Sequence, residues 1–148
     1  MRALYTIGYT KKTLREFITR LRAHGVDCVV DIRLNNTSQL AGFSKRDDLE
    51  FLLKDGFGIG YVHLPDLAPT EELLTEYRSN KNWDSYQAWY ESLVEERGMV
   101  AQFLRMAEEH NWQRPCLLCA EDVADHCHRR VLAEAIADEA EDLEVVHL

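Results

Sequence analysis

Several features that would assign this 148-residue sequence to a specialised class are absent. No segment approaches the roughly 18 consecutive apolar residues of a membrane-spanning helix. The opening MRALYTIGYT lacks the layout of a signal peptide, because its apolar stretch is short and typical of a strand. We therefore expect a cytoplasmic protein with no membrane partner, whose four cysteines are thiols or ligands rather than disulfides.

An excess of positive charge is also missing, since the net charge is −9. Generic nucleic-acid binders are basic, so non-specific binding to a phosphate backbone is disfavoured. The charge is uneven, however: residues 1–33 carry seven Lys or Arg and three acids, a balance of +4 that leaves −13 for the remainder. We interpret the acidic stretch 134–144 as a solvated helix face. A local anion site near the N-terminal third stays open.

The known glycine-rich phosphate motifs are not found either. Neither a P-loop nor GxGxxG occurs, because Gly56, Gly58 and Gly60 have the wrong spacing. Cysteine phosphatases place an arginine six residues after the catalytic cysteine. Ala133 and Asp125 stand at that spacing from Cys127 and Cys119. No repeat, linker or low-complexity segment appears, so we interpret residues 1–148 as a single domain.

What the sequence does contain is an alternation of apolar strands and amphipathic helices. Strands are predicted at 3–10, 26–33, 59–65, 114–120 and 143–148. Helices are predicted after Thr10, which is a plausible N-cap, at 45–58, at 69–80, from 83 to about 110 with a break near Gly98, and at 125–140. Residues 34–44 have the composition of a loop. The order predicts a three-layer, Rossmann-like α/β fold with a mostly parallel five-stranded sheet and helices on both faces.

Unusual polar residues follow four of the predicted strands. In an open parallel sheet, sites form beyond the carboxyl ends of the strands, and those ends share one edge. We therefore expect one cavity there, with substrate-binding candidates at the ends of strands one and two and catalytic candidates at the end of strand four. The residues at these ends are Gly8, Tyr9, Thr10, Asp31, Arg33, Cys119 and Glu121.

The segment LLCAEDVADHCHRR contains the most concentrated chemistry. Cys127 is predicted in the first turn of a helix that Asp125 could cap, among histidines and arginines. A helix dipole and nearby cations lower a thiol pKa and favour a nucleophilic thiolate. A small buried cysteine with a structural role, or a ligand, is the alternative. Cys119 is either a second thiol candidate or strand packing.

Glu121 and two arginines form the polar part of this prediction. Glu121 is expected either to pair with Arg33 or Arg129 or to act as an acid–base group. The clamp is favoured, in which case Glu121→Gln would leave a buried cation unpaired. Arg33 and Arg129, with His128 beside them, are candidates for binding a phosphate or carboxylate. An ion pair with Asp31 or Glu121 is the alternative.

A zinc knuckle is suggested by the two-residue spacing between Cys116 and Cys119, with Cys127 and His128 as further ligands. The pair lies within a predicted strand, however, where residues three apart point to opposite faces. We therefore predict no metal site and no cofactor.

The motifs YTIGYT, VVDIR with SQLAGFS, YVHLPDLAP, LLCAED and CHRR, in this order, resemble the domain of unknown function 488 family from Tyr5 to Leu148. The resemblance implies an α/β fold but supplies no reaction. Here Tyr9-Thr10 replaces the family's His-Ser, and Asn36 stands where a proline is common. The family pattern carries over to Gly8, Asp31, Arg33, Ser38, Gly42, Phe43, Cys119, Glu121, Cys127, His128 and Arg129, which adds Ser38 to the substrate-binding candidates.

Three functional hypotheses follow from the sequence. The first is a small pocket enzyme that acts on a phosphate- or carboxylate-bearing substrate, such as a nucleotide or a nucleic-acid end. The second is a non-catalytic module that binds such a ligand through its arginines and aromatic residues. The third is a metal-stabilised interaction protein. An enzyme requires that the pocket expose a nucleophile or an acid–base group.

Overall fold

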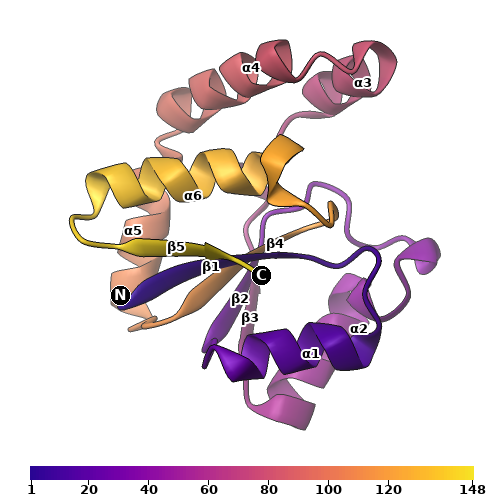
Figure 1. Cartoon of the computed structure of the whole chain (residues 1–148), viewed down its shortest axis with the longest axis vertical. Coiled ribbons are helices and arrows are strands. Elements are labelled where there is room, and N and C mark those ends of the chain that lie inside the picture. The colour runs from indigo at the N-terminus through magenta and orange to yellow at the C-terminus, as the bar shows by residue number, and fades with distance from the viewer.

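The computed structural model covers residues 1–148 and has one sheet of five parallel strands with helices on both faces (Figure 1). The spatial order of the strands is β3-β2-β4-β1-β5, and every neighbouring pair is parallel. The strands are β1 (Ala3–Gly8), β2 (Cys28–Asp31), β3 (Gly60–His63), β4 (Pro115–Cys119) and β5 (Glu144–His147). The predicted fold class is confirmed.

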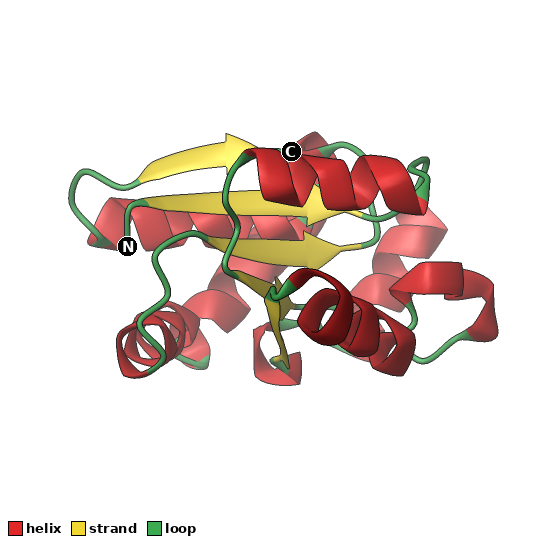
Figure 2. Cartoon of the chain, turned by 90° about the horizontal axis from the view of Figure 1, so that it is seen from below, coloured by secondary structure: helices red, strands yellow, loops and turns green.

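The chain has six α-helices, and the arrows of the strands run in the same sense (Figure 2). The helices are α1 (Leu14–Ala23), α2 (Arg46–Phe51), α3 (Glu71–Asn80), α4 (Trp83–Glu96), α5 (Met99–Glu109) and α6 (His128–Glu139). A π turn at Leu52–Gly56 extends α2. The break expected near Gly98 is confirmed, since this glycine has a φ of 61° between α4 and α5. No helix is both long enough and apolar enough to span a membrane.

Two apolar clusters flank the sheet because its strands are buried on both faces. Helices α1 and α2 cover one face with Phe17, Leu21 and Leu49. Helices α4, α5 and α6 cover the other with residues such as Phe103 and Leu132. Continuous apolar strands of this kind are expected when a parallel sheet has helices on both sides.

The connections define where a site can form. The chain leaves β1 and β2 toward the face of α1 and α2, but it leaves β4 toward the opposite face through α6. Since β4 lies between β1 and β2, neighbouring strands diverge to opposite faces on both sides of its carboxyl end. Ligand crevices in open α/β sheets form at such switch points. The fold therefore directs attention to Cys119, the last residue of β4.

Three local predictions were wrong. The N-cap of α1 is Thr13 rather than Thr10, and it forms a capping box with Glu16. The segment expected to be loop contains a 3-10 helix at Gln39–Ser44. Helix α6 begins at His128, three residues after the start of the predicted range 125–140, and Cys127 rather than Asp125 is its N-cap. A 3-10 turn at Ala124–His126 lies between the end of β4 and the start of α6.

Candidate functional site at the carboxyl end of β4

A pocket of about 230 Å³ opens where the sequence predicted one, beyond the carboxyl ends of the strands. Six of the predicted site residues line it: Tyr9, Arg33, Cys119, Glu121, Cys127 and His128. The lining does not include the other predicted residues, which are Gly8, Thr10, Asp31, Ser38 and Arg129. Helix α3 adds Tyr77, Arg78 and Lys81 to the wall, and α4 adds Tyr86.

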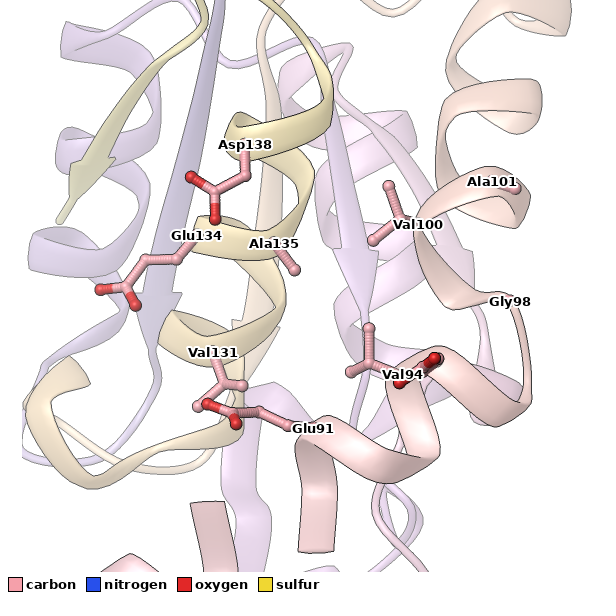
Figure 3. Close-up of a pocket in the computed structure, with 10 residues that line it drawn as sticks. Glu91, Val94, Gly98, Val100, Ala101, Val131, Glu134, Ala135 and Asp138 are labelled. Atoms are coloured by element: carbon pink, nitrogen blue, oxygen red, sulfur yellow. The ribbon is translucent and has the colours of Figure 1, made fainter. Parts of the chain in front are cut away.

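A second pocket, of about 390 Å³, lies among α4, α5 and α6 (Figure 3). Valines form part of its wall, and the carboxylates of Glu91, Glu134 and Asp138 lie around it. It is the larger of the two, but its lining contains no cysteine, histidine, lysine or arginine. Of these two pockets, only the smaller one, at the end of β4, contains cysteine thiols and basic side chains.

Gly8 does not bind a ligand in this arrangement; it makes room for the loop that follows β4. It pairs with Cys119 across the sheet, and a Cβ at this position would overlap the Glu121 carbonyl oxygen. Only a glycine therefore allows the chain after Cys119 to pass this close to β1. Thr10 fixes the same loop, since its hydroxyl donates to the Ala120 carbonyl at 2.7 Å. Lys12, whose side chain is buried, adds an ion pair to Asp122 at 2.6 Å.

Asp31 and Arg33 form a closed polar cluster at the end of β2. The Arg33 guanidinium makes two hydrogen bonds to the Asp31 carboxylate, of 2.8 and 2.7 Å. Tyr61 donates to the same carboxylate at 2.5 Å and Asn36 at 3.2 Å. Burial raises the pKa of Asp31, but the Arg33 bonds outweigh burial and the pKa lies below its usual value. The ion-pair alternative is therefore the one found for Arg33.

Ser38 lies apart from the pocket. It is exposed, and its hydroxyl caps the 3-10 helix by accepting from the Leu40 amide at 3.2 Å. Its predicted place among the substrate-binding residues was inferred from the family pattern, which does not separate residues that shape a loop from residues that face a ligand. Tyr9, in contrast, lies at the pocket with its ring 5.3 Å from the Arg33 guanidinium carbon.

Arg129 is the second buried arginine, and no carboxylate faces it. Its side chain is 1% exposed. The guanidinium donates to the backbone carbonyls of Glu121 and Asp122, to the Thr6 hydroxyl and, at 3.0 Å, to the Cys119 sulfur. A buried cation needs a counter-charge, because desolvation without one is costly. Cys119 is the only group in this set that can become an anion.

The Cys119 sulfur is surrounded by donors. Burial alone raises the pKa of this thiol, but the hydrogen bond from Cys127 and the Arg129 guanidinium outweigh burial and lower the pKa below its usual value. The Glu121 amide adds a further donor. Hydrogen bonds to the charged form stabilise that form, so Cys119 is the cysteine of the pair that ionises more readily.

Cys127 has the opposite character, which favours the structural alternative over activation by the helix dipole. Burial and the neighbouring Cys119 sulfur raise its pKa well above the usual value. The Cys127 thiol therefore keeps its proton. Burial and a neighbouring anion outweigh the favourable effect of a helix N-terminus, which amounts to a fraction of a charge.

His128 orients the N-terminus of α6. Its Nε2 lies 3.0 Å from the Ile32 carbonyl oxygen. Because a carbonyl oxygen can only accept a hydrogen bond, Nε2 carries the ring proton and Nδ1 is unprotonated. Nδ1 faces the Cys127 sulfur at 3.9 Å. Burial lowers the pKa of His128 to about 4, which keeps the ring neutral at physiological pH.

Glu121 does not clamp either arginine, so the favoured interpretation of its side chain was wrong. The residue is exposed, and its carboxylate makes no ion pair with Arg33 or Arg129. It serves Arg129 through its backbone carbonyl instead. The carboxylate lies at the pocket, where an acid–base role remains a prediction.

Two cations of the pocket were missed from the sequence. Arg78 and Lys81 are exposed at the end of α3, and neither takes part in an ion pair. Lys81 ends α3 in the left-handed conformation, which reverses the chain into α4 and keeps its ammonium 6.0 Å from the Tyr77 ring. Surface cations on a helix give no sequence signal, because only the fold brings them to the pocket.

The candidate zinc ligands do not assemble. Cys116 belongs to the apolar cluster on the α1 face, whereas Cys119 faces the pocket. No group of three His, Cys, Asp or Glu side chains is arranged as a ligand set anywhere in the structure.

Fold and site together define the class: a parallel α/β protein with a buried cysteine–arginine pair at the switch point of its sheet. The family model described as Domain of unknown function DUF488 matches residues 13–136, and the chain belongs to that family. No match was found among curated proteins or among solved structures.

Proposed function

We propose that this protein is a thiol-dependent pocket enzyme in which the Cys119 thiolate attacks a small substrate that carries a negative charge. The observation that carries the proposal is the Arg129 guanidinium, which is buried without a carboxylate and lies 3.0 Å from the Cys119 sulfur. A structural cysteine would gain nothing from such a partner. A nucleophile would, because the cation holds the sulfur in its reactive, ionised form.

The anionic character of the substrate is supported by the pocket wall. Arg78 and Lys81 carry positive charge at the opening and have no acidic partner. The chain as a whole is strongly acidic, so this local reversal of sign is where an anion would be attracted. A volume of about 230 Å³ is below the usual range for drug-sized ligands, which favours a small carboxylate or phosphate group or the terminal group of a larger molecule.

Alkylation kinetics test the nucleophile and the charge preference separately. With neutral iodoacetamide at pH 7, Cys119 should react at least about tenfold faster than an ordinary thiol, and Cys119→Ser should abolish this phase. With anionic iodoacetate, the double variant Arg78→Gln/Lys81→Gln should react more slowly at low salt while its iodoacetamide rate stays unchanged. A non-catalytic binding module would show the salt-dependent effect without the fast thiol.

A further inference from the structure

The proposed nucleophile has a second thiol against it. Cys119 and Cys127 come from different elements, the end of β4 and the N-cap of α6. Both line the same pocket. The other two cysteines are not part of this arrangement. Burial raises the pKa of Cys28 to about 12 and raises that of Cys116 further, so both are protonated and unreactive.

We propose that Cys127 is a resolving thiol and that the substrate is a small disulfide with carboxylate groups, which the pair reduces by thiol–disulfide exchange. The inference rests on the proposed nucleophilic role of Cys119. In the first step the Cys119 thiolate attacks one substrate sulfur, a mixed disulfide forms, and the other half of the substrate leaves as a thiolate.

In the second step Cys127 attacks the Cys119 sulfur of that mixed disulfide. Its proton passes to the departing substrate thiolate, while the neutral His128 ring, with Nδ1 3.9 Å from the Cys127 sulfur, holds the side chain in place. A disulfide between Cys119 and Cys127 forms as the second substrate thiolate departs. One disulfide bond is broken and one is made, so the substrate gains two electrons and the two protein thiols lose them.

The geometry favours resolution from inside the protein. Cys119 is 1% exposed and Cys127 is 3% exposed, so an external thiol has little access to an adduct on Cys119. Cys127 is the other cysteine that lines this pocket, whereas Cys28 and Cys116 do not line it. Arg129 also stabilises the reduced form through the Cys119 thiolate, so the pair is a mild reductant that acts on disulfides whose leaving thiolates are themselves stable, and its internal disulfide is readily reduced again.

A competing interpretation gives Cys127 no chemistry: its thiol would only donate a hydrogen bond that holds the Cys119 thiolate. The two interpretations agree on Cys119 and differ in what happens to a mixed disulfide. The aromatic disulfide dithio-bis-nitrobenzoate distinguishes them, because it carries carboxylates and releases a coloured thiolate at each exchange step. The experiment uses the full chain, freshly reduced and freed of reductant.

Resolution predicts rapid release of about two coloured thiolates per chain and a product whose mass matches an internal disulfide without an adduct, with Cys119 and Cys127 joined on peptide mapping. Cys127→Ser should release about one and retain a stable adduct on Cys119, and Cys28→Ser should behave like the parent. If Cys127→Ser does not fold, the intact mass of the parent product still distinguishes the two interpretations. A lasting adduct on Cys119 in the parent would overturn the resolving role and leave the nucleophile in place. No rapid phase at all would overturn the nucleophile itself.

Discussion

Arg33 and Arg129 are both buried at the carboxyl edge of the sheet, yet their surroundings balance charge in different ways. Arg33 makes two hydrogen bonds to the Asp31 carboxylate, and the ion pair is closed by Tyr61 and Asn36. Arg129 meets carbonyls, a hydroxyl and the Cys119 sulfur. The first cluster is neutral and has a structural role. The second leaves a positive charge that favours a thiolate, which is why the chemistry is assigned to Arg129.

The largest effect should come from opening the closed cluster. Asp31→Asn leaves the Arg33 guanidinium buried without its counter-charge, and we expect a loss of about 3–5 kcal/mol in the free energy of unfolding. Denaturant unfolding measures this. The control is Asp47→Asn, which removes the exposed partner of Arg46 and should change stability by less than about 0.5 kcal/mol. Equal effects of the two substitutions would contradict the assignment of Arg33 to a closed pair.

His128 connects the two clusters, because it bonds the carbonyl that precedes Arg33 and stands one residue before Arg129. Its pKa is lowered from 6.5 to about 4, so between these values the unfolded chain binds the proton and the folded chain does not. The free energy of unfolding therefore has its full value above pH 6.5 and falls by about 3 kcal/mol as the pH drops to 4. Unfolding titrations of the parent and of His128→Asn should show this slope only in the parent. The same slope in both would assign it to another group.

Removing the thiolate should destabilise the protein in a pH-dependent way. The pKa of Cys119 is lowered in the folded state, so its stabilising contribution is present above the ordinary thiol pKa and is lost as the pH falls through the folded value. Cys119→Ser should therefore cost about 1.5–3 kcal/mol at pH 9 and less at pH 6, which paired unfolding curves at the two pH values measure. A cost independent of pH would mean that Arg129 does not pair with an anion.

The smallest effect is expected at Glu121. Since its exposed carboxylate pairs with neither arginine, Glu121→Gln should change the free energy of unfolding by no more than about 0.5 kcal/mol. A thermal melt compared with the parent is sufficient. A large loss of stability would restore the clamp that the sequence favoured and would weaken the contrast between the two arginines.

The ends of the strands could be predicted because each apolar run is followed by glycine, polar or charged residues. Arg33 follows its own partner by two positions, so its ion pair was among the alternatives that the sequence offered. The partners of Arg129 were not predictable, because two of them are backbone carbonyls, which any residue supplies. Sequence could not decide between the two cysteines, because it reveals a helix N-terminus more readily than burial.

The family pattern likewise identified some residues of the site and missed others. It carried over to Gly8, whose role is to admit the Glu121 carbonyl, and to Ser38, which caps a 3-10 turn away from the pocket. It did not include Arg78 and Lys81, which reach the pocket through the turn between α3 and α4. A shared pattern therefore records residues that build the site together with residues that act in it, and geometry is needed to separate them.

The most direct test of the account is the ionisation of Cys119 itself, followed through the ultraviolet absorbance of its thiolate as a function of pH. The difference between the parent and Cys119→Ser isolates this sulfur from the other three. We predict a thiolate in the parent that titrates below the ordinary thiol value of 9.0 and disappears in the variant. A Cys119 that ionises only at or above that value would contradict the claim that Arg129 holds a thiolate, and with it the proposed chemistry.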